Sequence, residues 1–100
     1  MDSNIEKLYN KINNNQDFII FGLSTCRYCK EAIMLLKNKN IKYKNYYIDK
    51  YNNLFFKVFQ ELSELYPNFN IDKTHKTVPV IFYKKKFVGG YTELKKILNS

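Results

Sequence analysis

The chain has 100 residues and a mass of 12.1 kDa, a size that suits one domain around one hydrophobic core. Of these residues, 45% are hydrophobic and 17% are aromatic, which argues against a disordered chain. The longest apolar run, Phe18 to Leu23, is far shorter than the roughly 20 residues that span a membrane. The polar start Met1-Asp2-Ser3-Asn4 does not resemble a secretion signal, so we expect a cytoplasmic protein.

The formal net charge of +8 raises the possibility of a nucleic-acid or anionic-membrane partner. However, 16 of the 17 basic residues are lysines, and only Arg27 has the forked guanidinium that suits phosphates and guanine. We therefore expect neither a specific nucleic-acid partner nor a membrane partner. A basic binding module remains the third-ranked interpretation.

Hydrophobic spacing predicts a helix from Ser3 to about Asn13 at the start of the chain. The continuous apolar run Phe18 to Phe21 predicts a central strand that is buried on both faces. A second helix is expected from Cys26 to about Lys39, followed by a tyrosine-rich strand from Lys42 to Ile48. Because a strand, helix and strand in succession form a right-handed crossover, these two strands should be parallel.

The second half of the chain predicts another helix, a hairpin and a final short helix. Leu54 to Leu65 has the apolar stripe of an amphipathic helix, which Pro67 should terminate. Val80 to Tyr83 and Phe87-Val88 flank a lysine-rich turn and predict a hairpin. Thr92 is expected to cap the final helix. The whole chain, residues 1–100, is thus expected to be a single domain of the α/β class.

The cysteines form a single local C-x-x-C pair, Cys26 and Cys29. Two cysteines are too few for a disulfide-stapled scaffold, and with the single histidine, His75, they cannot supply four zinc ligands. His75 is expected to be a surface loop residue without a role.

The position of Cys26 between a buried strand and a helix points to thiol chemistry. A thiolate there faces unpaired N–H groups and the positive end of the helix dipole, which lower its pKa from about 8.5. Arg27 and Lys30 add positive charge nearby, and Ser24 and Thr25 are suitable cap residues. Cys29 lies one turn further along, where it can attack a disulfide formed by the first sulfur. We therefore assign Cys26 as the nucleophile and Cys29 as the resolving thiol.

Two other interpretations of the pair stay open at this point. The cysteines could be inert core residues, or they could form half of a metal site, as in copper chaperones that carry Thr-Cys-x-x-Cys after a first strand. Those carriers begin with that strand and have a methionine near the pair. Here a predicted helix comes first, and the nearest methionine, Met34, lies well inside the following helix.

Three segments of the sequence resemble motifs of one known family. Phe21 to Cys29, Thr77-Val78-Pro79 and Gly89-Gly90-Tyr91-Thr92 are similar to the active-site, cis-proline and glycine-pair motifs of dithiol glutaredoxins, in the same order. The resemblance covers Phe18 to Leu98. It implies a thioredoxin-like fold, a four-stranded mixed sheet flanked by helices, and a cis bond before Pro79 that turns the Val78 backbone toward the sulfur.

The resemblance also implies a reaction and a binding site. The enzyme would be a glutathione-dependent thiol–disulfide oxidoreductase that reduces protein–glutathione mixed disulfides and protein disulfides. It would act as a monomer, with glutathione as co-substrate and without a metal or another tightly bound cofactor. The alternative remains a copper or iron–sulfur carrier. The residues expected to bind glutathione are Arg27, Tyr28, Lys76, Thr77, Val78, Pro79, Gly90, Tyr91 and Thr92.

Two positions depart from the family pattern. Arg27 stands where the family often has proline, and Leu23 stands where it often has a basic residue. Arg27 could strengthen thiolate stabilisation, whereas Leu23 removes a usual glutathione contact. Thr92 with the first N–H groups of its helix would bind one carboxylate of glutathione, and Lys76 would bind the other.

Overall fold

The structure is a computed structural model that describes residues 3–99; residues 1, 2 and 100 of the expected domain, including the start of the polar N-terminus, lie outside this range. The chain alternates helices and strands as the hydrophobic spacing predicts. The elements are α1 (Ser3–Asn13), β1 (Phe18–Gly22), α2 (Arg27–Asn38), β2 (Tyr43–Tyr47), α3 (Asn52–Leu65), the 3₁₀ turn η1 (Pro67–Phe69), β3 (Val80–Tyr83), β4 (Lys86–Gly89) and α4 (Tyr91–Leu98).

The four strands form one mixed sheet in the order β2-β1-β3-β4. β1 is parallel to β2, as the crossover predicts, and antiparallel to β3. β3 and β4 form the expected antiparallel hairpin, whose turn places Lys84 and Lys85 at positive φ angles of 48° and 66°. The predicted four-stranded mixed sheet is confirmed.

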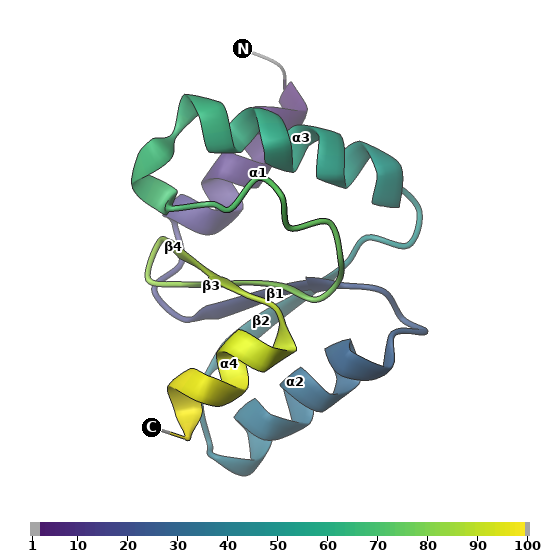
Figure 1. The fold of residues 1–100 in the computed structure, drawn as a ribbon, viewed down its shortest axis with the longest axis vertical. Coiled ribbons are helices and arrows are strands. Elements are labelled where there is room, and N and C mark those ends of the chain that lie inside the picture. The colour runs from purple at the N-terminus through teal and green to yellow at the C-terminus, as the bar shows by residue number, and fades with distance from the viewer. Residues whose placement is uncertain (1–2, 100) are drawn as a thin grey trace.

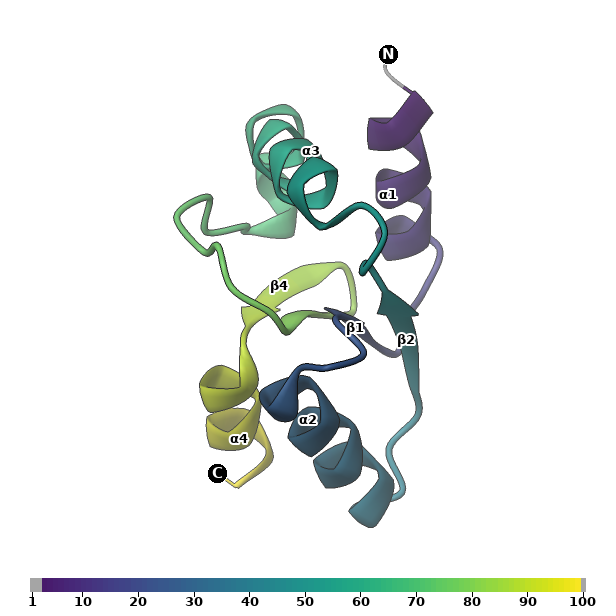
Figure 2. The same cartoon turned by 90° about the vertical axis from the view of Figure 1, so that its right-hand side faces the viewer.

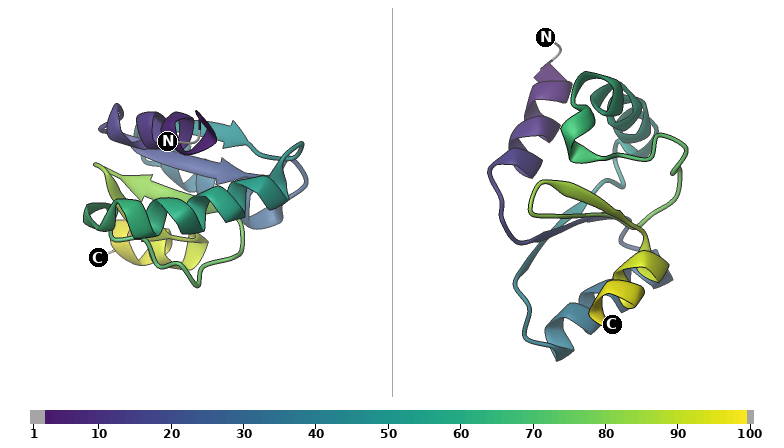
Figure 3. Two further views of the ribbon diagram at one scale, coloured as in Figure 1. Left: turned by 90° about the horizontal axis from the view of Figure 1, so that it is seen from above. Right: turned by 60° about the vertical axis from the view of Figure 1, so that its left-hand side comes forward.

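The helices cover both faces of the sheet (Figure 1). In the view turned by 90°, α1 and α3 lie on one side of the strands, and α2 and α4 lie on the other (Figure 2). Seen from above, α1 and α3 lie over the strands, and a view from an intermediate angle shows the three layers again (Figure 3). β1 lies between these layers, and all five of its residues are buried.

The alternating side chains of β1 supply two separate cores. Ile19 and Phe21 point into the larger core beneath α1 and α3, which is rich in phenylalanine. Phe18 and Ile20 point into a smaller, mainly aliphatic core beneath α2 and α4. A strand that contributes to both cores is fixed in register, because a one-residue slip would exchange its two faces. The end of β1, where the C-x-x-C segment begins, is therefore held firmly.

None of the helices among residues 3–99 is both long enough and apolar enough to cross a membrane.

Candidate active site

Cys26 itself caps the N-terminus of α2. Its backbone is extended, with φ −84° and ψ 119°, and its Sγ accepts a hydrogen bond from the N–H of Cys29 at 3.1 Å. The sulfur therefore lies at the positive end of the helix, among N–H groups that have no partner within the helix. The expectation that Ser24 or Thr25 would cap this helix is wrong, because Cys26 occupies the cap position.

The two cysteines are bonded to each other and differ in exposure. Cys26 and Cys29 form a disulfide; Cys26 is half-buried, whereas only 1% of Cys29 is exposed. Behind Cys29 lies the last residue of β1, Gly22, where an added Cβ would be 2.7 Å from the Cys29 Sγ. The second sulfur thus occupies space that only a glycine leaves open. Of the two sulfurs, Cys26 is the one that a large substrate can approach.

The loop before β3 lies against the first cysteine. The Val78–Pro79 peptide bond is cis, as the resemblance implied. The carbonyl oxygen of Val78 lies 4.0 Å from the Cys26 Sγ. Pro79 is buried and Val78 is half-buried, so this short backbone segment forms one side of the sulfur site.

The glycine pair adjoins the same loop. A Cβ added at Gly90 would lie 3.5 Å from the carbonyl oxygen of Pro79 and 3.4 Å from the Cε1 of His75. The Nε2 of His75 lies 3.4 Å from that same carbonyl oxygen, and its ring meets Phe87 edge-on at 5.3 Å. His75 lies in a loop as expected, but it is half-buried and packs between the loop and the hairpin. The three motifs that were recognised in the sequence are thus neighbours in space.

The N-terminus of α4 differs from the sequence-based expectation. Gly90 is the N-cap, and its N–H donates a hydrogen bond to the Oε1 of Glu93 at 2.8 Å. Thr92 lies in the first turn and is exposed, so the prediction that it caps the helix is wrong. The first bond within the helix runs from the Leu94 N–H to the Gly90 carbonyl at 3.1 Å. The N–H groups of Tyr91 and Thr92 precede it.

Two tyrosines connect the starts of α2 and α4. The rings of Tyr28 and Tyr91 are stacked with centroids 5.7 Å apart, and Tyr28 remains 56% exposed. Arg27 points along the helix surface, where its Nε pairs with the Oε1 of Glu31 at 3.3 Å. With 83% of the Arg27 side chain exposed, this ion pair is weak and leaves the guanidinium free to move.

The remaining predicted binding residues are spread over exposed loop positions. Lys76 and Thr77 are exposed and precede the Val78–Pro79 bond directly. Leu23, the position without the usual basic residue, is half-buried and packs against the larger core. The glutathione-binding roles of these residues stay predictions.

A carboxylate that the sequence did not single out fixes the segment before Cys26. Asp49, just after β2, accepts hydrogen bonds from the Ser24 N–H at 3.0 and 3.2 Å and also from the Ser24 hydroxyl. The bond from the hydroxyl, followed by the bond from the backbone, lowers the pKa of Asp49 below 3.8. The available signal was topological: Asp49 follows a strand parallel to β1, so both strand ends meet at one edge of the sheet.

Within residues 3–99, no group of three or more histidine, cysteine and acidic residues is arranged to hold a metal ion.

Comparison with known proteins agrees with this arrangement. A glutaredoxin family model matches residues 18–88, which include the C-x-x-C pair and the Thr77-Val78-Pro79 segment. The chain belongs to the glutaredoxin family. The resemblance read from the three motifs is confirmed, and a copper-chaperone fold is excluded.

Individual relatives lead to the same assignment. The chain is 30% identical over 82 residues to "Probable glutaredoxin" of Acanthamoeba polyphaga mimivirus, covering 82% of this chain and 77% of the relative. It is 34% identical over 85 residues to "Glutaredoxin-1" of Ectromelia virus, with coverage of 85% and 74%. A buckwheat glutaredoxin solved as a glutathione complex superimposes with a TM-score of 0.70 at 20% identity, covering 95% of this chain and 78% of that one. Family membership and the bonded Cys26–Cys29 pair support thiol–disulfide oxidoreductase activity.

Proposed function

We propose that this protein is a glutathione-dependent dithiol oxidoreductase that reduces protein–glutathione mixed disulfides and protein disulfides. The observation that carries the proposal is the position of the Cys26 Sγ, which caps α2 and lies 4.0 Å from the Val78 carbonyl oxygen. The helix N-terminus stabilises a thiolate, and the Val78 backbone beside the sulfur can pair with the backbone of a cysteinyl peptide.

In the reduced enzyme, the Cys26 thiolate attacks the glutathione sulfur of a mixed disulfide. A bond forms between that sulfur and Cys26, the original S–S bond breaks, and the protein leaves as a thiolate that takes a proton from water. A glutathione thiolate then attacks the glutathione sulfur held on Cys26. Glutathione disulfide leaves and the Cys26 thiolate is restored. Each cycle consumes one free glutathione, and the other half of the glutathione disulfide comes from the substrate.

For a protein disulfide, Cys29 takes part as well. Cys26 attacks first and forms a mixed disulfide with the substrate, and the Cys29 thiolate then attacks the Cys26 sulfur and releases the reduced substrate. The product is the Cys26–Cys29 disulfide, which two glutathione molecules reduce in turn. The hydrogen bond from the Cys29 N–H to the Cys26 Sγ shows how close the two residues lie.

Glutathione would bind along the groups that surround Cys26. The Val78 backbone would pair with its peptide, and Thr77 and Pro79 would flank that pairing. One carboxylate would face the N–H groups of Tyr91 and Thr92 at the start of α4. Glu93 already accepts a hydrogen bond from the Gly90 N–H, so this N–H would not bind glutathione. Because Gly90 has no side chain, it would instead let glutathione lie close to the backbone. Lys76, Arg27 and Tyr28 complete the proposed set.

The test is a coupled assay that contains a small glutathione mixed disulfide, glutathione, and glutathione reductase with its nicotinamide cofactor. We expect turnover that depends on glutathione concentration. Omitting glutathione and supplying thioredoxin reductase instead provides the control. Turnover only in that control would contradict glutathione dependence while leaving the oxidoreductase assignment intact.

Lys76 has its own expected effect. Because a solvent-exposed ion pair contributes only about 0.2 to 1 kcal/mol, Lys76→Ala should raise the KM for the glutathionylated substrate by roughly 1.4- to fivefold. Added salt should reduce this difference. An unchanged KM at low salt would remove Lys76 from the site. We further propose that the enzyme works as a monomer in the cytoplasm, where glutathione is plentiful.

A further inference from the structure

A cavity of about 370 Å³ opens between α1 and α3, on the face of the sheet opposite to α2. Its size falls in the range of small-molecule sites in proteins, about 300 to 1,000 Å³. Apart from Phe21, which begins the motif around the C-x-x-C pair, none of its lining residues belongs to the candidate active site. They are Asn4, Lys7, Leu8, Lys11, Phe21, Tyr51, Leu54, Phe55 and Val58.

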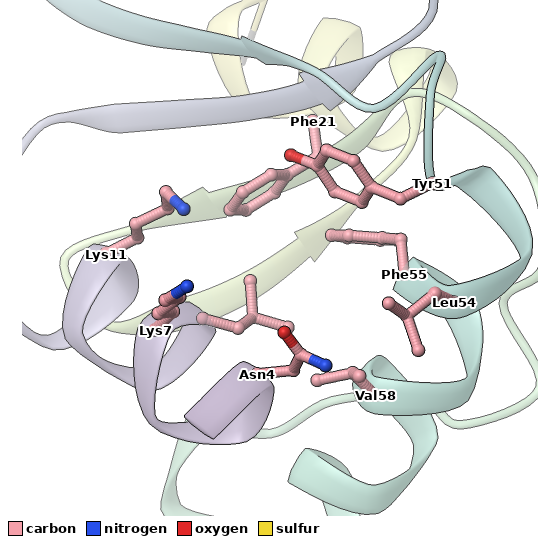
Figure 4. Close-up of a pocket in the computed structure, with 9 residues that line it drawn as sticks. Asn4, Lys7, Lys11, Phe21, Tyr51, Leu54, Phe55 and Val58 are labelled. Atoms are coloured by element: carbon pink, nitrogen blue, oxygen red, sulfur yellow. The ribbon is translucent and has the colours of Figure 1, made fainter. Parts of the chain in front are cut away.

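The cavity has an apolar floor and a basic wall (Figure 4). Phe21 of β1 and Phe55 of α3 form the floor together with Leu8 and Val58, and each of these four side chains is buried. Lys7 and Lys11 lie one turn apart on the α1 side, with α3 across the opening. An occupant would meet hydrocarbon below and two ammonium groups at one side.

Among residues 3–99, no side chain neutralises the positive charge of this wall. Within residues 3–99, neither lysine forms an ion pair, and the described lining residues include no carboxylate. The Nζ of Lys11 lies 5.3 Å from the centre of the Tyr46 ring, which holds the ammonium near the cavity without reducing its charge. An anion is the missing counterpart.

The same two lysines also border a second, shallower depression. Lys44 of β2 and the amide side chains of Asn10 and Asn14 line it as well. The basic wall therefore continues outward from the apolar floor, with a third ammonium group beyond the first two. An anionic head group could be held there while its hydrocarbon part enters the cavity.

We propose that this cavity binds a small amphiphilic carboxylate, a molecule with a slim apolar body and one anionic head. The body would replace water over the exposed side chains of Tyr51 and Leu54, and the head would lie between Lys7 and Lys11. A saturated fatty-acid anion of medium chain length is the simplest molecule with this chemistry.

The shape of the opening favours a slim molecule over a docked peptide helix. α1 and α3 contact each other beside the cavity, whereas a helix with its side chains is about 10 to 12 Å wide. The floor side chains are only 1% to 6% exposed, so the accessible apolar surface of the cavity belongs mainly to Tyr51 and Leu54 at its opening. Two side chains can cover a linear hydrocarbon chain, but they offer too little surface for a helix.

The test follows backbone amide NMR signals during titration with dodecanoate below its micelle concentration. We expect saturable shifts confined to residues of α1, α3 and the end of β1. Dodecyltrimethylammonium, with the same chain and the opposite charge, should bind at least tenfold more weakly. Equal affinity for both amphiphiles, or shifts centred on α2 and α4, would overturn the proposal.

A pair of matched variants tests the basic wall. Lys7→Glu/Lys11→Glu should weaken dodecanoate binding by about tenfold, because two favourable charge contacts become repulsive. Lys95→Glu/Lys96→Glu on the exposed surface of α4 changes the net charge by the same amount and should leave the affinity within twofold. Equal losses in both variants would mean that only the overall charge matters, which contradicts a defined site.

A second pair of measurements separates this proposal from its rivals. An acidic, leucine-rich peptide that binds the same residues more tightly than dodecanoate would show that the cavity is a peptide site and refute the carboxylate assignment. Alkylation of reduced Cys26 should proceed at the same rate in Lys7→Glu/Lys11→Glu as in the unaltered protein. The proposal for the cavity and the proposal for the thiol site can therefore be refuted separately.

Discussion

The starts of α2 and α4 lie side by side on one face of the sheet, yet they satisfy their free N–H groups in opposite ways. At α2 the acceptor is the sulfur of Cys26, the proposed nucleophile. At α4 the acceptor is the permanent carboxylate of Glu93, which binds the Gly90 N–H. The positive end of α2 is thus placed to stabilise a thiolate, whereas the positive end of α4 is satisfied by a carboxylate of the fold itself.

The difference extends to the residues behind each helix start. Behind α2, Gly22 leaves so little room that a methyl group would meet the Cys29 Sγ at 2.7 Å. Behind α4, a methyl group on Gly90 would make contacts of 3.4 and 3.5 Å, which are ordinary van der Waals distances. We infer that the start of α2 tolerates little change, whereas the start of α4 tolerates more.

The largest expected effect separates capping from chemistry at α2. Serine is a good N-cap, so Cys26→Ser should keep the fold while turnover falls to the uncatalysed rate. Cys29→Ser should retain reduction of glutathione mixed disulfides and lose most reduction of protein disulfides. The coupled assay with each substrate measures both rates. Equal losses from the two single substitutions would contradict the assigned division of roles.

Alkylation of Cys29→Ser protein as a function of pH examines the same helix start directly. If the N-terminus of α2 stabilises the thiolate, the midpoint should lie well below the free-thiol value of about 8.5. A midpoint near 8.5 would show that the cap position does not activate the sulfur.

The next effect concerns the two glycines. Gly22→Ala should lower the free energy of unfolding by about 1 to 3 kcal/mol, because the added methyl overpacks the buried disulfide. Gly90→Ala is the matched control and should change it by no more than about 1 kcal/mol. Urea denaturation of the oxidised proteins measures both values. A Gly22→Ala protein as stable as the Gly90→Ala protein would refute the crowding at Cys29.

A smaller effect is expected at the start of α4. Glu93→Ala removes the acceptor for the Gly90 N–H and a favourable charge in the first turn, which together should cost about 0.5 to 1 kcal/mol. Glu64→Ala, near the C-terminal end of α3, provides the control and should cause no loss, because a carboxylate is unfavourable there. Thermal unfolding compares the two, and equal destabilisation would argue against the cap.

The smallest effect depends on pH and involves Asp49. Hydrogen bonds from Ser24 hold the folded-state pKa of Asp49 below 3.8, so its ionised form stabilises the fold at neutral pH. That contribution should disappear as the pH falls from 3.8 through the lowered pKa. The difference in Tm between the unaltered protein and Asp49→Ala should therefore be largest near neutrality and shrink in acid.

Serine variants supply the control for this pH dependence. Ser24→Ala removes the leading cause of the lowered Asp49 pKa. The difference in Tm between the unaltered protein and Ser24→Ala should therefore also shrink in acid, by a smaller amount than for Asp49→Ala. Ser63→Ala removes a hydroxyl that bonds to the backbone of its own helix and should leave the acid dependence unchanged. If Tm varied with pH in the same way for Ser63→Ala and Ser24→Ala, the Ser24–Asp49 contact would be excluded as the source of the acid dependence.

Periodic hydrophobicity and spaced motifs were sufficient to predict the sheet, the helices and the position of Cys26. They failed where loop residues find partners far away in sequence. Ser24 is a residue type that often caps helices, but it forms hydrogen bonds with Asp49 instead, and Cys26 takes the cap position. No periodicity marks His75, a single histidine in a polar loop, so its packing on Phe87 had no signal. Glu93 could have been found, since it follows Gly90 by the three residues of a capping box.

The sheet order also bears on how copies of this aromatic-rich chain behave toward one another. β2 and β4 are the edge strands, and unpaired edges invite strand addition and cross-β aggregation. Lys44 is exposed on β2, and Lys86 on β4 reaches across to the carbonyl oxygen of Asn68 at 2.5 Å, where η1 packs beside that strand. Edge-to-edge pairing of two copies would bring ammonium groups together. We therefore expect these lysines to disfavour edge-to-edge aggregation of a chain that is 17% aromatic.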